Sequence, residues 1–145
     1  MSEPRINFVN IVVGQRGSGK TTLILDVMEH SSQSKILVCD TFDHQAYNKY
    51  ENISIPQLKT FKKGTRHLFG SDTKLIFDAV TNVHNALVVY EDATKYIEEK
   101  VPDKVKCYIL DTKQKNVDLV FLFHCLGDVP PKLFRWTDTL TIFKT

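Results

Sequence analysis

The chain contains 145 residues, of which 42% are hydrophobic and 25% charged, and its formal net charge is +2. These values are ordinary for a globular protein, and the length suits one domain over residues 1–145 rather than two. Because basic and acidic residues are mixed, the overall charge excludes a strong electrostatic signature of nucleic-acid or membrane binding.

A glycine-rich loop lies between the first predicted strand and the first predicted helix. The apolar, β-branched run 6–13 predicts a buried strand, and the pattern at 21–30 predicts a helix. The segment between them matches the phosphate-binding pattern GxxxxGK, followed by Ser or Thr, at every fixed position. This order of strand, loop and helix is the one that a phosphate-binding loop requires.

The residue types of this loop suit a nucleoside triphosphate. Glycines let the backbone curl so that successive N–H groups point at phosphate oxygens, and the helix N-terminus adds partial positive charge. Lys20 is expected to reach the β- and γ-phosphates, and the Thr21 hydroxyl to take one position on Mg²⁺. The predicted nucleotide-binding residues are Gly14, Gln15, Arg16, Gly17, Ser18, Gly19, Lys20, Thr21 and Thr22.

A short strand at 35–39 and a polar stretch at 41–56 without a clear period come next. We expect the stretch to leave the carboxyl edge of the sheet, where ligands bind in open α/β folds. Asp40, Asp43 and His44 could approach a nucleotide there. An ordinary surface loop with an Asp-based turn is the favoured interpretation.

Basic residues gather after a predicted short helix or turn at 55–61. Four of them cluster around Gly64: Lys59, Lys62, Lys63 and Arg66. A solvated loop explains this cluster adequately, so we favour that interpretation over a DNA contact. A short strand at 66–69 and a helix from 72 to about 83 are predicted next.

Two adjacent carboxylates, Glu91 and Asp92, follow a buried apolar strand that begins near Ala86. In P-loop enzymes a carboxylate at such a strand tip holds Mg²⁺ beside the loop hydroxyl, and its neighbour orients and deprotonates the attacking water. By position, we predict that Glu91 serves the metal together with Thr21 and that Asp92 serves the water. A strand that merely ends in an acidic turn is the weaker interpretation, because the chain already has the loop.

The remaining patterns predict a helix at 101–116, a central strand at 117–124, a short helix or turn at 131–136 and a last strand at 139–143. His124 closes the most hydrophobic run of the chain. A polar side chain at that tip could sense the γ-phosphate, and a histidine merely satisfied at the sheet edge is nearly as well supported.

The sequence also bears on the compartment. The cysteines Cys39, Cys107 and Cys125 are odd in number and widely spaced, so we expect buried thiols in a reducing environment. No apolar stretch approaches the length of a membrane span, and the N-terminus does not resemble a signal peptide. We therefore expect a cytoplasmic protein without a transmembrane segment.

Four pieces of the sequence, in order, resemble the HerA/FtsK superfamily of P-loop ATPases. That group includes DNA translocases, genome-packaging ATPases of membrane-containing viruses and zonula-occludens-toxin-like phage assembly proteins. The pieces are 14–21, 88–92, 113–118, and the strand that ends in His124 and is followed by Asp128-Val129-Pro130-Pro131. In the family the third piece usually carries an arginine that acts on a neighbour's nucleotide, and the fourth usually ends in a glutamine sensor.

The chain departs from this family pattern in two motifs. Glu91-Asp92 stands where Asp-Glu is more usual, which implies slow turnover or a water held at a different distance. Lys113 stands in the place of the arginine, and lysine is not equivalent at a bidentate phosphate contact. Arg16 could supply that function instead, with Arg135 as a weaker candidate. An arginine finger contributes about three to five orders of magnitude in rate.

These observations predict a three-layer α/β sandwich of the RecA/ASCE-like P-loop class with a mostly parallel central sheet. The resemblance implies a Mg²⁺-dependent ATPase that acts as a homo-oligomeric ring, a pentamer or hexamer, and translocates DNA, most simply to package a phage or viral genome with a capsid partner. Two alternatives stay open: a small-molecule kinase, and a nucleotide-binding assembly or switch protein with little turnover. The kinase is less favoured because only four arginines occur in the chain.

Overall fold

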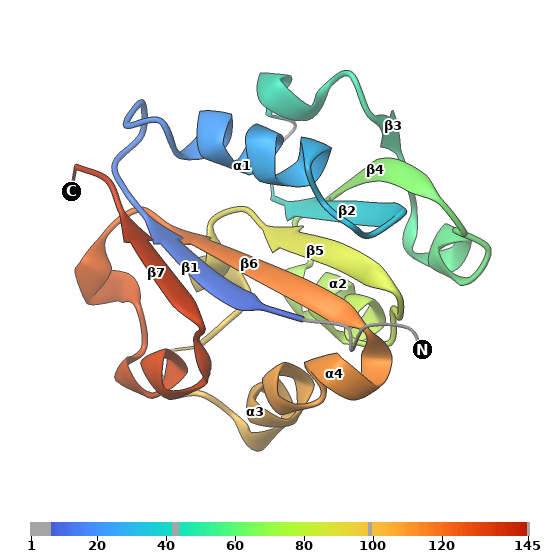
Figure 1. Cartoon of the computed structure of the whole chain (residues 1–145). Coiled ribbons are helices and arrows are strands. Elements are labelled where there is room, and N and C mark those ends of the chain that lie inside the picture. Colours follow the sequence, from blue (N-terminus) through green and yellow to red (C-terminus); the bar gives the residue numbers. More distant parts are fainter. Residues whose placement is uncertain (1–6, 42–43, 99, 145) are drawn as a thin grey trace, which may run out of the picture.

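The computed structural model describes residues 7–41, 44–98 and 100–144. A seven-stranded sheet in this part of the chain has the order β3-β4-β2-β5-β6-β1-β7, and every neighbouring pair is parallel (Figure 1). The strands are β1 Val9–Val13, β2 Lys35–Asp40, β3 Glu51–Asn52, β4 Gly64–Phe69, β5 Ala86–Tyr90, β6 Val117–Phe123 and β7 Thr139–Ile142.

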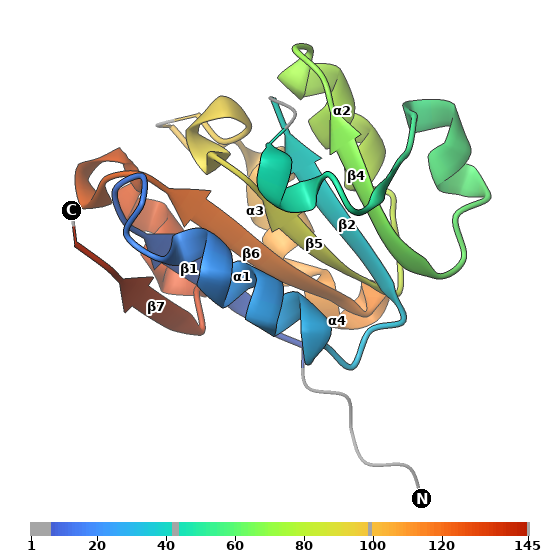
Figure 2. The same ribbon diagram turned by 90° about the horizontal axis from the view of Figure 1, so that it is seen from above.

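Helices cover both faces of this sheet and give three layers (Figure 2). Helix α1, Lys20–Glu29, lies on one face, and α2, Thr73–Val80, lies on the other with α3, Asp103–Leu110, and α4, Thr112–Lys115. Short 3-10 helices complete the connections: η1 Gln45–Tyr47, η2 Ile55–Lys59, η3 Ala93–Lys95, η4 Leu126–Asp128 and η5 Pro131–Trp136. The predicted three-layer α/β fold is confirmed, and the sheet is parallel throughout the described residues.

Two hydrophobic clusters hold the layers together. Ile24 and Met28 of α1 pack with Val38 of β2 and Val89 of β5 on one face. The opposite face carries the larger cluster, in which side chains of β5 and β6 meet α2 and α3. Every residue of β5 and β6 is buried, which explains why these segments, apart from Asp118, are apolar without alternation in the sequence.

The parallel register brings four strand ends to one edge of the sheet. Val13 pairs with Phe123, Tyr90 with Phe121, and Cys39 with Tyr90. Because β6 lies between β1 and β5, the residues that follow these strands become neighbours although they are far apart in sequence. We call this side the carboxyl edge and the side where the strands begin the amino edge.

Several sequence predictions differ from the structure in detail. The predicted helix at 101–116 is two helices, because Asp111 departs from helical geometry with φ −89° and ψ 8°. Aspartate competes with the backbone for hydrogen bonds and is a poor residue inside a helix. The stretch 41–56 contains η1 and the edge strand β3. Ile6, at the start of the first predicted strand, lies outside the described residues.

The expectation of three buried thiols is wrong for two of them. Cys39 in β2 is buried, but Cys107 on α3 and Cys125 after β6 are exposed. Cys107 lies on the outward side of its helix, and Cys125 has already left the sheet, so an apolar neighbourhood in sequence misled the prediction. None of the described helices is both long and apolar enough to cross a membrane.

Candidate active site

The glycine-rich loop follows β1 and leads into α1, as predicted. Gly17 and Gly19 have φ values of 79° and 106°, a region that residues with a Cβ rarely adopt. Gly14 is required for a different reason, since a Cβ there would lie 2.5 Å from Ser18 Oγ and 2.8 Å from Phe143 Cβ. These three glycines are therefore needed for the shape of the loop.

The last described residues of the chain support the loop from the side. The amide of Phe143 donates to the carbonyl of Val13 over 2.7 Å, and the amide of Gln15 donates to the carbonyl of Lys144 over 2.9 Å. The ring of Phe143 also lies 3.5 Å from the position that a Cβ of Gly19 would take. Strand β7 and the residues after it thus hold both ends of the loop.

The Lys20 side chain lies at the centre of the carboxyl edge. It is only 6% exposed, and its Nζ lies 3.0 Å from His124 Nδ1 and 3.5 Å from the carbonyl oxygen of Phe123. Burial lowers the pKa of this ammonium group, and the nearby carboxylates of Glu91 and Asp92 partly offset that effect. Because the two carboxylates compensate only in part for the burial of the Lys20 ammonium group, the site favours an anionic ligand.

A second polar group in the loop is ready for a ligand. Ser18 Oγ is buried and has no hydrogen-bond partner among the residues that the structure describes. Buried hydroxyls normally have a partner, so an unpaired one inside a phosphate-binding loop fits a phosphate oxygen or the shell of a bound Mg²⁺. Thr21 and Thr22 lie in the first turn of α1; Thr21 is half-buried and Thr22 is exposed.

The two predicted carboxylates lie on the same edge as Lys20. Glu91 is 6% exposed, and its amide donates to the carbonyl of Cys39 over 2.9 Å. Asp92 adopts a left-handed conformation with φ 53°, and its Oδ2 lies 3.8 Å from His124 Nε2. His124 therefore stands between the Lys20 ammonium and the Asp92 carboxylate, with one ring nitrogen toward each.

The structure adds a residue that the sequence did not predict. Tyr47, in η1, is 1% exposed, and its hydroxyl donates a 2.7 Å hydrogen bond to Glu91 Oε2. Burial, together with the Glu91 carboxylate, raises the pKa of Tyr47, so the hydroxyl stays protonated as a donor. In the sequence, the only hint of this role is that Tyr47 is an aromatic residue within a polar stretch.

A buried polar cluster continues from Tyr47 away from the loop. Asp40 and His67 are fully buried, and His67 Nε2 lies 3.5 Å from Asp40 Oδ2. Asp40 also pairs with His44, and the ring of His67 packs on Tyr47. Asp40 is thus not part of an exposed turn, contrary to the favoured interpretation, and Asp43 lies outside the described residues.

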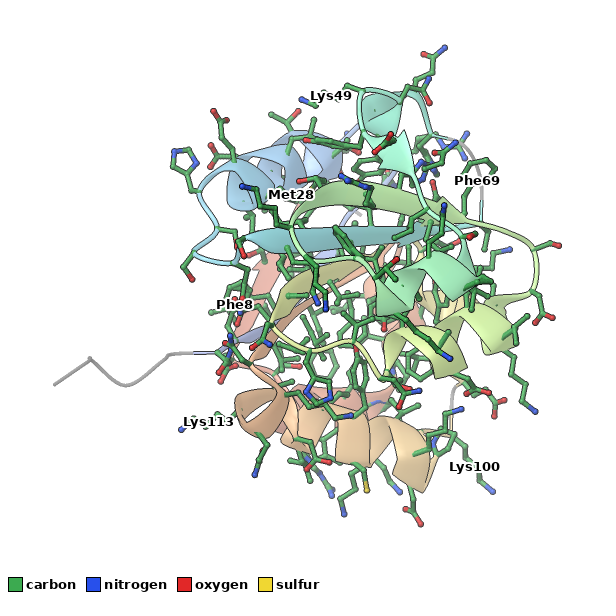
Figure 3. The ribbon with its side chains drawn as sticks, turned by 90° about the vertical axis from the view of Figure 1, so that its right-hand side faces the viewer. Phe8, Met28, Lys49, Phe69, Lys100 and Lys113 are labelled. Atoms are coloured by element: carbon green, nitrogen blue, oxygen red, sulfur yellow. The ribbon has the colours of Figure 1, made fainter. Side chains whose placement is uncertain are left out.

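The basic residues named from the sequence occupy different places. Arg16 is exposed in the loop and close enough to Lys20 to lower the pKa of that ammonium group. Lys113 is exposed on α4, which precedes β6, and so lies at the amino edge away from the loop of the same chain (Figures 1 and 3). Arg135 is exposed in η5.

Taken together, the carboxyl edge offers one buried cation, two carboxylates and an imidazole beside a loop shaped by glycines. Cations and backbone amides stabilise a polyphosphate, and oxygen ligands suit Mg²⁺. A carboxylate near the same point can orient a water for attack on phosphorus. The arrangement is therefore competent for phosphoryl transfer to water.

Comparison with known proteins agrees with this chemistry. A family model described as an AAA domain matches residues 7–119. No curated protein sequence matches the chain.

Solved structures extend the likeness over nearly the whole chain. The genome packaging NTPase B204 from Sulfolobus turreted icosahedral virus 2, in complex with ATP-gammaS, is 17% identical with a TM-score of 0.74, over 99% of this chain and 77% of that chain. Its AMPPCP complex gives a TM-score of 0.76 at 16% identity, over 96% of this chain and 76% of that chain. The N-terminal domain of zonular occludens toxin from Neisseria meningitidis gives a TM-score of 0.51 at 16% identity, over 86% of this chain and 70% of that chain. At these identities the likeness shows a shared fold.

Proposed function

The chain belongs to the AAA domain family and is an ATP hydrolase of the P-loop type, and from this premise we propose that it is a Mg²⁺-dependent motor that translocates DNA. We further propose that its task is to package a phage or viral genome into a capsid, in the cytoplasm of the host cell. The observation that carries the site assignment is the position of His124 between the Lys20 ammonium and the Asp92 carboxylate.

Each residue of the carboxyl edge has a proposed role in hydrolysis. Lys20 and the loop amides bind the β- and γ-phosphates and stabilise the charge that grows on them. Asp92 orients the attacking water and accepts its proton. His124 contacts both Lys20 and Asp92, so it is placed to couple the binding of the γ-phosphate at Lys20 to the position of the base Asp92.

A bound Mg²⁺ would neutralise charge on the β- and γ-phosphate oxygens. We propose that the Thr21 hydroxyl and Glu91 hold it, because both carry oxygen ligands and Glu91 is fixed on one side by Tyr47. The buried Ser18 hydroxyl, which has no hydrogen-bond partner among the described residues, also supports an oxygen-rich ligand at this loop.

The arginine function is assigned to Arg16. It is an exposed guanidinium in the loop itself, beside Lys20, and guanidinium is suited to bidentate phosphate contacts. Lys113 lies at the opposite edge, so it could reach only the nucleotide of a neighbouring subunit in a homo-oligomeric ring.

Packaging is proposed by analogy of fold with B204, which is described as a genome packaging NTPase. The test is the release of free phosphate from ATP, with and without duplex DNA, with Mg²⁺ or with EDTA, by the wild type and by Lys20→Ala. We expect DNA-stimulated, Mg²⁺-dependent release, and a loss of about 100-fold or more in Lys20→Ala. Lys74→Ala, which removes an exposed lysine of α2, is the matched control.

Other results would select an alternative. A phosphorylated small-molecule acceptor would indicate a kinase. ATP binding with negligible turnover, insensitive to DNA, would indicate an assembly or switch protein. Unchanged hydrolysis in Lys20→Ala would contradict the site itself. The mass of the ATP-bound protein in solution gives the number of subunits.

A further inference from the structure

We propose that the amino edge of the sheet binds nucleic-acid phosphates in a cationic groove that includes Lys35, Lys59 and Lys62. The inference rests on the proposed DNA motor and adds the surface through which the motor meets DNA. The sequence alone favoured a solvated loop for the basic residues around Gly64. The fold supports a binding surface instead, because it brings together basic residues from separate segments.

The segments that lead into four neighbouring strands carry no acidic residue. There is no Asp or Glu between Glu29 and Asp40, between Glu51 and Asp72, between Asp78 and Glu91, or between Asp111 and Asp118. These segments precede or contain the beginnings of β2, β4, β5 and β6, which are adjacent in the sheet. Other acidic residues at this edge, Asp26 and Glu29 in the last turns of α1 and Asp118 near the start of β6, lie outside these segments.

A groove of about 440 Å³ lies within this acid-free region. Its walls come from the start of β2, from η2 and the turn after it, and from the turn between α2 and β5. Lys35, Lys59, Lys62 and His84 line it with two asparagines, and no carboxylate is among its lining residues. Figure 3 views the molecule from the side on which the strands of Figure 1 begin.

Lys35 and Lys62 lie close enough to repel each other. Burial lowers the pKa of the Lys35 ammonium group, and the positive charge of Lys62 lowers it further. Beside the groove, Arg66 lies over the ring of Phe61 and pairs with Glu51 at 3.4 Å. An anion in the groove would relieve the repulsion between Lys35 and Lys62.

The shape and chemistry favour a phosphate backbone over bases or free nucleotide. Phe61 lines the groove but is only 7% exposed under Lys35 and Arg66, so it offers no open face for base stacking. Exposed lysines that contact phosphates bind without reading sequence, as a translocating motor requires. The ATP site lies at the other edge of the same sheet, so both ligands fit at once.

The test compares Lys59→Gln/Lys62→Gln with a matched double variant, Lys100→Gln/Lys132→Gln, which removes two exposed lysines outside the groove. A short fluorescein-labelled DNA duplex of random sequence is the probe, and its anisotropy is titrated at several salt concentrations. K59Q/K62Q should bind about 10- to 100-fold more weakly near 0.1 M salt, and its log–log salt slope should shrink by about 1.8. The control should keep the wild-type affinity and slope.

The outcomes separate the two proposals. Wild-type affinity and slope in K59Q/K62Q would overturn the groove while leaving the DNA motor intact. A wild-type protein that hydrolyses ATP but never binds the duplex would overturn the DNA motor as well. Equal weakening in both double variants would also overturn the groove, because it would show that total charge, not this surface, holds the DNA.

Discussion

The hydroxyl of Tyr47 donates a 2.7 Å hydrogen bond to Oε2 of Glu91, between two residues that are both almost completely buried. This bond fixes one oxygen of the carboxylate that we assign to Mg²⁺. Partners that orient a metal-binding group from behind commonly set the affinity for the metal. Tyr47 is therefore a positioning residue, and its effect should appear in the Mg²⁺ dependence of turnover.

Tyr47→Phe should raise the Mg²⁺ concentration for half-maximal ATP hydrolysis about 10-fold, because the bond that orients Glu91 is lost. The free energy of unfolding should also fall by about 1 to 2 kcal/mol, since a buried bond to a charged group is removed. Magnesium titrations of phosphate release and urea unfolding measure the two effects.

Tyr50→Phe is the matched control for this prediction. Tyr50 is half-buried near Tyr47, and the ammonium of Lys49 lies 5.3 Å above its ring. Removal of the Tyr50 hydroxyl should leave the Mg²⁺ requirement unchanged. An unaltered requirement in Tyr47→Phe as well would show that Glu91 does not depend on this tyrosine.

The neighbouring carboxylates should differ when each is replaced by its amide. Asp92→Asn should retain ATP binding, because the phosphate-binding loop is unchanged. Its rate of hydrolysis should fall about 100-fold or more, because the base for the attacking water is lost. Glu91→Gln should mainly raise the Mg²⁺ requirement. Single-turnover hydrolysis and binding of a fluorescent ATP analogue distinguish the two. Normal hydrolysis by Asp92→Asn would show that another residue is the base.

The phosphate-binding loop and the acidic strand tip could be predicted because each is a local pattern in a fixed structural context. The strand before Glu91 is fully buried and the strand before Gly14 is buried except at Asn10, so their apolar runs are unambiguous. The parallel sheet then makes their ends meet. The sequence predicted a central strand at 117–124, but nothing local indicated that this strand, β6, lies between β1 and β5.

Contacts that depend on long-range packing were out of reach. Tyr47 and Glu91 are 44 residues apart, and Lys20 and His124 are 104 apart. Tyr47 belongs to a stretch without a hydrophobic period, in which a buried tyrosine and an exposed one read alike. The basic groove is similar: each lysine looks like a solvated side chain until the sheet order places the acid-free segments side by side.

His124 should affect the chemical step more than substrate binding. Its ring joins Lys20 to Asp92, so His124→Ala should lower kcat by about 100-fold, while KM for ATP changes little. His124→Gln can still accept and donate hydrogen bonds, so it should keep most of the activity. Steady-state kinetics across an ATP range measure both parameters. Equal losses in the two variants would contradict a hydrogen-bonding role.

Tyr96→Phe should stabilise the protein. The Tyr96 hydroxyl is buried and has no hydrogen-bond partner among the described residues, so its removal should raise the free energy of unfolding by about 1 kcal/mol at neutral pH. Burial also raises the pKa of Tyr96 above its ordinary value of 10.0. Above that pH the unfolded chain therefore ionises first and binds fewer protons, and stability falls as pH rises. Loss of this tyrosine should remove up to about 1.4 kcal/mol per pH unit from that decline. Urea unfolding from pH 7 to 11 tests both effects.

Tyr108→Phe is the contrast, because it breaks a 2.9 Å hydrogen bond to Tyr90 and should destabilise the protein at neutral pH. Destabilisation by Tyr96→Phe would mean that its hydroxyl has a partner in solution.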